Sequence, residues 1–374
     1  MTVRNLYQAL QARSVAVVGA GGPPGTAGPR VLAGILAGGF EGPVWPVDPG
    51  RGEVHGLPAF SSPLELPEAP DLAVVAGPAA AIPGLIGELG TRGCRLAVVL
   101  SEVPEAAQRQ AMLDAARPHL LRVIGPGSDG LIVPALRLAA TLAPTAPVAG
   151  ELALVSQSGT VAAALVERAA DHGIGLSCVL SLGGMADVDV GDCIDLLAGD
   201  GRTRAILLYL ESVPAPRKFL SAARAAARVK PVIVLKAGRT PRAAAAAATH
   251  TGRLAGEEAV VEAALARAGV VRVGGLAELF AAAETLARSR PMSRARLAVV
   301  TNSGGAGVLA VDRLEAAGGT LAGLAAATVE RLDSGLPRPW SGGNPVDIGS
   351  GAAPSDFGAA LAVVAADRGS TRCW

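Results

Sequence analysis

The residues best suited to chemistry lie in the stretch from Val232 to Gly256. His250, one of four histidines, stands between two threonines and is followed by Gly252, which lets a backbone approach a ligand closely. Six alanines precede it, and a neutral imidazole is a nucleophile near physiological pH. Two interpretations stay open. His250 is either a surface histidine beyond an alanine-rich helix, or a nucleophile on a mobile loop that carries a group between two sites.

A second candidate is an anion-binding turn at the start of a helix. The apolar run 152–155 predicts a buried strand, and a helix is expected to follow as far as about His172. Between them stand small hydroxyl residues and a glycine, whose free N–H groups suit a phosphate: Ser156, Gln157, Ser158, Gly159 and Thr160. The alternative is simple helix capping by Ser158, worth about 1 kcal/mol.

One carboxylate ends a predicted strand on the same part of the chain. Glu211 directly follows the apolar run Ala205–Leu210. In open α/β sheets, ligands bind at the carboxyl ends of the strands, so Glu211 stands where it could face a ligand. A carboxylate at a sheet edge with no such role is the alternative.

A third motif is a glycine-rich loop near the N-terminus. The run 14–18 predicts a buried strand, GAGGPPGTAG follows from Gly19 to Gly28, and a helix is expected from about Pro29 to Gly38. Strand, glycine loop and helix together form a binding site for a nucleotide phosphate. The spacing is looser than the dinucleotide fingerprint, so NAD is the weaker reading. Asp48, after the strand 44–47, could hold a ribose or form a stiff wall for an adenine with Pro49.

The elements that must position these residues are those of parallel α/β sheets. Short apolar runs separated by helix-sized segments predict parallel strands, at 72–76, 96–100, 122–124, 177–180 and 232–235. A proline-rich linker, 144–147, closes the first domain. Residues 296–319 repeat 151–174 at a constant offset of 145, which indicates two copies of one βα-type domain. We therefore expect three domains, at 1–145, 146–290 and 291–374, the last of them partial and truncated.

Composition narrows the classes of function. With 33 basic and 32 acidic residues the formal net charge is +1, and aromatic residues make up 3 %, so neither nucleic acid nor an anionic membrane is an expected partner. The four cysteines (Cys94, Cys178, Cys193 and Cys373) lack the spacing of a disulfide framework or a zinc site, and no other metal site is expected. The N-terminus lacks the apolar region of a signal peptide, and prolines and glycines interrupt the run 72–89. These features predict a cytoplasmic protein without membrane spans.

Taken together and in order, the motifs resemble the nucleoside-diphosphate-forming acyl-CoA synthetase superfamily, which includes succinyl-CoA synthetase and ADP-forming acetate–CoA ligase. The resemblance covers nearly the whole chain. The segments that carry it are SVAVVGAGGPPGTAG, VWPVDP, GPGSDGLI, LALVSQSG, GGMADVD, LYLE, KPVIVLKAGR, THTGRLAG, VTNSGGAGVLA and GNPVDIG. It implies an α/β chain: a Rossmann-like CoA-binding domain, a flavodoxin-like ligase-CoA domain, and part of a second flavodoxin-like domain.

The resemblance implies an acid–CoA ligase working through a phosphohistidine at His250. That residue would take phosphate from an acyl phosphate and pass it to ADP, with Glu211 orienting the ring and the turn 156–160 holding the phosphate. The chain shows no ATP-grasp region, so a separate ATP-grasp β-type subunit would supply the ATP/ADP and Mg²⁺ site, in a homo- or hetero-oligomer. A small carboxylic acid or acyl-CoA would be the substrate.

The same resemblance assigns coenzyme A to the first domain. Gly19, Gly25 and Gly28 would lie near the phosphates, and Val47, Asp48 and Pro49 near the adenine. Gly77 and Pro78 would lie beside the pantetheine arm, and Gly127 and Ser128 near the thioester.

Three features depart from the family pattern. The family has Asn at the positions of Gly127 and Gly184, and a Ser-x-Gly-Phe run where this chain has the segment 101–104. With the short third domain, these departures leave a second hypothesis open: a regulatory or remnant protein that binds CoA or acyl-CoA without turnover.

Overall fold

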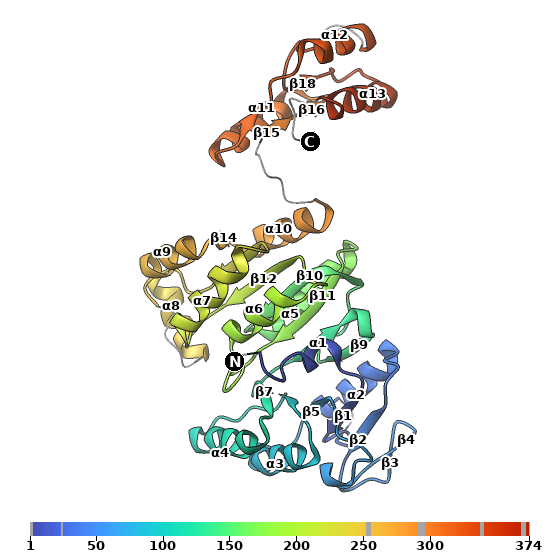
Figure 1. Ribbon diagram of the computed structural model, residues 1–374, viewed down its shortest axis with the longest axis vertical. Helices are drawn as coiled ribbons and strands as arrows, with labels where there is room; N and C mark the ends of the chain where they lie inside the picture. The colour runs from blue at the N-terminus through green and yellow to red at the C-terminus, as the bar shows by residue number, and fades with distance from the viewer. Residues whose placement is uncertain are drawn as a thin grey trace. The chain divides into compact units, whose positions relative to one another are not determined.

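The computed structural model describes residues 3–23, 25–251, 256–289, 296–336, 340–367 and 372–373. The chain forms two compact units, Met1–Ser289 and Arg290–Trp374. Figure 1 colours the first unit from blue to light orange and the second in deeper orange and red. Within the described ranges, no helix has both the length and the apolar character that a membrane crossing requires.

The first unit begins with a five-stranded parallel sheet. Its strand order is β2-β1-β5-β6-β7, and the strands are β1 (Val15–Val18), β2 (Val44–Val47), β5 (Leu72–Val75), β6 (Leu96–Val99) and β7 (Arg122–Ile124). The connecting helices are α2 (Ala27–Gly38), α3 (Ile82–Arg92) and α4 (Ala106–Ala116), after a short α1 (Gln8–Gln11). A small hairpin, β3 (Glu53–Val54) with β4 (Leu57–Pro58), follows β2. This is the parallel crossover pattern that the sequence predicts.

A second sheet of seven strands has the order β14-β13-β12-β10-β11-β8-β9. Its parallel strands are β10 (Ala149–Ser156), β11 (Leu176–Ser181), β12 (Ala205–Leu210), β13 (Val232–Lys236) and β14 (Val271–Val273). Two antiparallel strands, β8 (Gly130–Val133) and β9 (Leu138–Thr141), complete it on the β11 side. The chain therefore enters the second sheet before the proline-rich linker.

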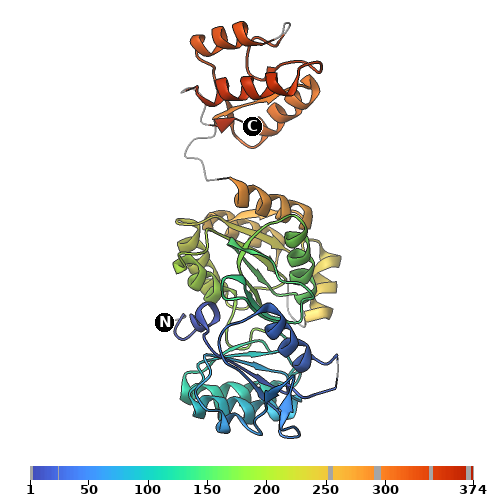
Figure 2. The ribbon, with the colours of Figure 1, turned by 90° about the vertical axis from the view of Figure 1, so that its right-hand side faces the viewer.

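Helices cover both faces of this second sheet (Figures 1 and 2). Apolar side chains of α5 (Gly159–Asp171) and α10 (Leu276–Arg288) pack with the strands on one face, and those of α6 (Val190–Gly199) and α7 (Pro216–Ala227) pack on the other. The core under α6 and α7 is continuous with that under α2 of the first sheet. A shared apolar core couples the two sheets, so the first unit holds side chains from both in fixed relation.

The second unit contains the repeat that the sequence predicts. Its strands are β15 (Arg296–Ala298), β16 (Val300–Thr301), β17 (Thr320–Leu321), β18 (Val346–Asp347) and β19 (Arg372–Cys373), and its helices are α11 (Gly304–Ala316), α12 (Ala326–Gly335) and α13 (Pro354–Ala365). Both ends of α11 keep the 145-residue offset from α5.

Candidate active site

A pocket of about 710 Å³ lies where the carboxyl ends of β10 and β12 face loops of the first domain. It is lined by parts of five segments, 102–109, 126–129, 157–160, 183–185 and 211–212. The structure thus brings together the anion-binding turn, Glu211 and Gly127, which lie far apart in the sequence. Ser156 and Ser128 are fully buried beneath this surface.

The turn before α5 has the geometry of an anion cradle. Ser158 caps the helix, since its Oγ accepts a hydrogen bond from the Val161 N–H at 3.4 Å and lies 3.0 Å from Thr160 Oγ1. Helix capping by Ser158 is thus confirmed, but it pairs only one N–H group of the turn. The N–H groups of Gly159 and Thr160 have no acceptor among the described residues. Unpaired N–H groups at the positive end of a helix dipole are suited to hold a phosphate.

Gln157 uses its side chain to join two strand ends. Its Oε1 accepts hydrogen bonds from the N–H groups of Glu211 at 2.6 Å and Ser212 at 2.9 Å, and its Nε2 donates to the Ser212 carbonyl at 2.7 Å. The residue is 9 % exposed. Its amide groups are therefore occupied by the backbone after β12, and Gln157 fixes the position of Glu211 relative to the cradle.

Glu211 itself lines the pocket with a free carboxylate edge. Among the described residues, the carboxylate accepts one hydrogen bond, from the Tyr209 hydroxyl to Oε1 at 3.5 Å, which is a weak contact. Burial and the nearby Glu211 charge raise the pKa of Tyr209. A carboxylate so loosely held can accept a hydrogen bond from an incoming imidazole.

The segment that carries His250 begins at the same edge of the sheet. β13 ends at Lys236, which is 3 % exposed, and α8 (Pro241–Thr251) follows. The backbone of His250 lies in the last turn of α8, so the prediction of a loop at this residue is wrong for its main chain. Its side chain, and residues 252–255 with Gly252, lie outside the described residues. An ion pair between Arg239 and Glu258, 3.2 Å long, joins the two ends of this segment.

The three departures from the family pattern, Gly127, Gly184 and the segment 101–104, meet in this pocket. Gly127 has a φ of +67°, and a β-carbon there would lie 2.5 Å from Glu102 Oε1. The Glu102 carboxylate thus occupies the space that a side chain at position 127 would need. Gly184 donates its N–H to the Pro126 carbonyl at 2.6 Å, so it takes part in closing the pocket from the second domain.

Sequence reasoning did not single out Arg109 and Asp129, and it named Glu102 only as part of the altered segment 101–104, which does line this pocket. Arg109 Nη1 donates to the Val103 carbonyl at 2.8 Å and to that of Pro104, so it stiffens the loop. Asp129 lies beside Gly159, where a β-carbon would be 1.3 Å from Asp129 Oδ2. The contact of Asp129 with Gly159 joins a loop of the first domain to the start of α5, and no spacing along the chain signals it.

The glycine loop after β1 borders a second pocket, of about 410 Å³. Gly25 lines it together with Arg30, Arg51 and His55, which the sequence analysis did not single out. Gly28 lies against Gly19, where a β-carbon would be 1.9 Å from the Gly19 carbonyl oxygen. These two glycines let α2 approach β1 closely. The arginines provide cationic groups that suit the phosphates of CoA.

Other residues predicted to contact CoA have local structural roles. Asp48 accepts the N–H groups of Gly21 and Gly50, each at 3.0 Å, and so shapes the glycine loop. Val47 is 1 % exposed and belongs to the core, whereas Pro49 is exposed. Gly77 accepts a hydrogen bond from the Ser101 hydroxyl at 2.5 Å, and the adjacent Pro78 precedes a short 3-10 turn.

The GGMADVD segment is divided between two roles: Gly183, Gly184 and Met185 line the pocket, whereas Asp187 joins a charge network beside it. Asp187 accepts from Arg122 Nε at 2.8 Å and from the Val123 N–H at 2.9 Å. Asp192, with a side chain 1 % exposed, pairs with Arg122 at 3.2 Å and with Lys218 at 2.6 Å. The network ties β7 of the first sheet to α6 and α7 of the second.

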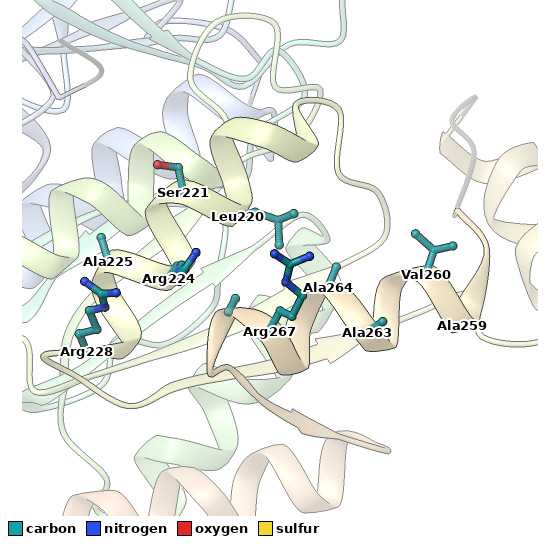
Figure 3. A pocket seen from close by; sticks show the side chains of 11 residues that line it. Leu220, Ser221, Arg224, Ala225, Arg228, Ala259, Val260, Ala263, Ala264 and Arg267 are labelled. Atoms are coloured by element: carbon teal, nitrogen blue, oxygen red, sulfur yellow. The ribbon is translucent and has the colours of Figure 1, made fainter.

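A wider hollow, of about 1070 Å³, lies outside this site, between α7 and α9 (Glu258–Ala268). Figure 3 shows arginines from both helices, Arg224, Arg228 and Arg267, over a floor of small side chains. No histidine, cysteine or carboxylate is among the residues that line it, and we assign it no part in the chemistry.

Thiol and metal chemistry find no support in the described part of the chain. Cys94, Cys178 and Cys193 are buried, and burial raises the pKa of Cys94 and Cys178 to about 12. A thiolate is the reactive form, so these thiols are poor nucleophiles. No cluster of three or more metal-ligating side chains occurs among the described residues.

Comparison with known proteins identifies the two domains of the first unit. Residues 13–134 match the model of a CoA binding domain, and residues 149–286 match that of a succinyl-CoA ligase like flavodoxin domain. The alpha subunit of ADP-forming acetate–CoA ligase I from Pyrococcus furiosus is 37 % identical over 316 residues, which cover 82 % of this chain and 68 % of that subunit. ADP-forming acetate–CoA ligase I from Archaeoglobus fulgidus is 35 % identical, over 94 % of this chain and 52 % of its own length.

A solved structure agrees in fold over most of the chain. It is a dinucleotide forming acetyl-coenzyme A synthetase 1 from Ca. Korarchaeum cryptofilum, in complex with phosphate and ADP. Its TM-score is 0.93 at 31 % identity, and the match covers 98 % of this chain and 81 % of that one. The chain spans about two thirds of the separate alpha subunit and about half of the longer ligase. It belongs to the family of ADP-forming acetate–CoA ligases and related acyl-CoA ligases.

Proposed function

We propose that this chain is the phosphohistidine-carrying part of an acid–CoA ligase that interconverts acyl-CoA, ADP and phosphate with acid, CoA and ATP. The observation that carries the proposal is the pocket at the ends of β10 and β12. It combines a helix N-terminus with unpaired N–H groups, a loosely held carboxylate, and Gly127 from the CoA-binding domain.

The reaction on this chain has two balanced steps. Inorganic phosphate attacks the thioester carbonyl, which forms an acyl phosphate and releases CoA as a thiol. The imidazole of His250 then attacks phosphorus, the P–O bond to the acyl group breaks, and the carboxylate leaves. Glu211 accepts the hydrogen bond of the ring N–H and offsets the positive charge that develops on the ring. The cradle 156–160 binds the phosphoryl group throughout.

Coenzyme A would lie along the first sheet. The glycine loop and the cationic side chains of Arg30 and Arg51 fit its phosphates, and the pocket beside Gly127 and Ser128 would receive the thioester. The positions named from the sequence at the adenine and pantetheine remain proposals.

The second half of the reaction needs a nucleotide site. We propose that an ATP-grasp partner subunit binds ADP or ATP with Mg²⁺ and receives the phosphoryl group from His250. Arg239, before α8, and Glu258, at the start of α9, form an ion pair that joins the two ends of the segment carrying His250. The relatives named as alpha subunits support a multi-subunit assembly.

The first half-reaction is testable without a partner. With acyl-CoA and inorganic phosphate, the chain alone should release CoA thiol in a single burst of about one equivalent, since the phosphohistidine has no acceptor. A panel of acyl-CoAs is needed because Glu102 and Gly127 alter the acyl pocket. If no acyl-CoA gives a burst, the chain binds CoA without turnover.

A further inference from the structure

The N-terminus of α5 already has an anion beside it. Asp129, in the loop between β7 and β8, places its carboxylate against Gly159, the first residue of the helix. A β-carbon at Gly159 would lie 1.3 Å from Asp129 Oδ2. The space next to the cradle is therefore filled by a side chain of the first-domain loop, and an incoming tetrahedral anion must share or take that space.

The Asp129 carboxylate is held loosely. Its backbone is fixed, because its N–H donates to Ser181 Oγ at 3.1 Å and its carbonyl accepts from Thr141 Oγ1 at 2.8 Å. Its side chain has no hydrogen bond or ion pair among the described residues. Burial raises the pKa of Asp129, and the Arg30 charge opposes this. The carboxylate is thus attracted by the helix dipole but is not anchored.

The internal repeat provides a comparison for this contact. In the second unit, Asp347 lies against Gly304, the first residue of α11, and a β-carbon there would lie 2.9 Å from Asp347 Oδ2. That carboxylate is anchored, because its Oδ1 accepts the N–H of Gly349 at 3.0 Å. The two aspartates come from different elements, the loop before β8 and strand β18, but each lies at the start of the repeated helix, and the one in the candidate active site lacks the anchor.

We propose that Asp129 is a displaceable internal anion, which competes with the phosphoryl group for the N-terminus of α5 and so limits the affinity of the cradle for phosphate. The inference rests on the proposed function, because it requires that the cradle 156–160 binds phosphate. A transfer site must release the phosphoryl group as well as bind it, and a competing carboxylate weakens the bound state without removing the N–H donors.

The test measures binding of inorganic phosphate and of sulfate to the full chain by calorimetry. Asp129→Asn and Asp129→Ala should each bind both anions about tenfold more tightly than the wild type, a change of the size expected for one charge near a helix terminus. Glu102→Gln is the matched control. It removes one negative charge from the same pocket but leaves the helix start unchanged, so its affinity should rise by less than about threefold.

A pH series provides a second readout. Sulfate keeps its charge between acidic and neutral pH, so a change in its affinity with pH reflects a change in the protonation of the protein. Affinity in the wild type should rise as pH falls toward the raised pKa of Asp129, because the protonated carboxyl no longer competes. This rise should be smaller in Asp129→Asn. In that variant the other charged groups of the pocket, Glu102, Glu211 and Arg109, are unchanged, and so is Arg30, whose charge acts on Asp129.

Each outcome decides the inference. Equal affinity in wild type and variants overturns it, while a burst of CoA release in the same proteins would leave the proposed function standing. Loss of folding in both variants also overturns it, since the carboxylate would then be a fixed structural partner. If neither the wild type nor the two Asp129 variants bind phosphate or sulfate, the cradle is not a phosphate site and the inference is wrong.

Discussion

Glu211 owes its position to a neighbour more than to contacts of its own. Gln157 binds the two backbone N–H groups at the end of β12, whereas the Glu211 carboxylate has one weak contact, with Tyr209. The side chain is therefore aimed by the backbone and left open toward the pocket. A residue held in this way can be changed without disturbing the core.

Replacement of Glu211 by Gln should slow phosphorylation of the chain at least about tenfold and leave its unfolding midpoint unchanged, because the amide keeps the shape but loses the charge that offsets the imidazolium. Rapid-quench labelling with acyl-CoA and phosphate measures the rate. Glu151→Gln, at the opposite end of β10, is the matched control and should label as the wild type does. A Glu211→Gln protein that labels normally but melts much earlier would make Glu211 structural.

Among individual residues, those at a strand end or a helix start could be predicted from the sequence as candidates for the site. The cradle 156–160 and Glu211 do share one pocket with Gly127. Asp129 and Arg51 were not singled out, because their importance depends on contacts between segments that are separated in the sequence. Gly127 appeared as a departure from the family pattern, but only the fold shows that the Glu102 carboxylate fills the space beside it.

At the scale of elements, the predicted strands 44–47, 122–124 and 205–210 match the observed bounds, and the others differ by a residue or a few. Short runs of buried apolar residues bounded by Gly, Pro or Ser explain this agreement. β8 and β9 were missed because a short apolar run carries no information about which sheet it joins. α8 continues through His250 because the helix-forming alanines outweigh the two threonines.

The network around Asp192 gives a prediction about how elements are joined. Asp192→Ala should lower the free energy of unfolding by about 3 kcal/mol, because it leaves the largely buried Arg122 and Lys218 without their shared carboxylate. Urea denaturation measures the loss. Asp114→Ala breaks an exposed pair with Arg117 and should cost less than about 0.5 kcal/mol. Equal losses in the two variants would contradict the assigned role of the network.

At the scale of the whole molecule, the chemistry is divided between two sheets that share one apolar core. The glycine loop of the first sheet and the cradle of the second are both in the first unit, so CoA and phosphate are expected to bind to a rigid body. The second unit repeats the strand and helix of the cradle, and we assign it no part in the reaction.

This division predicts how the chain selects its ligand. CoA should bind more tightly than NAD, and Arg51→Ala should weaken CoA binding about fivefold or more, because Arg51 lies beside the glycine loop with no ion pair among the described residues. Calorimetry compares the two ligands. Arg13→Ala, at the opposite end of β1, should bind CoA as the wild type does. Tighter binding of NAD than of CoA would contradict the assignment of this site.

The most direct test of the account is the location of the phosphoryl group. After incubation with labelled phosphate and an acyl-CoA, or with labelled ATP and an ATP-grasp partner, the chain should carry an acid-labile, base-stable label that is absent from His250→Ala. His172→Ala is the control, since His172 follows the far end of α5 and packs against Phe280 with ring centroids 5.0 Å apart. It should label as the wild type does. Acid-stable label, or label that persists in His250→Ala, would contradict a phosphohistidine at this residue.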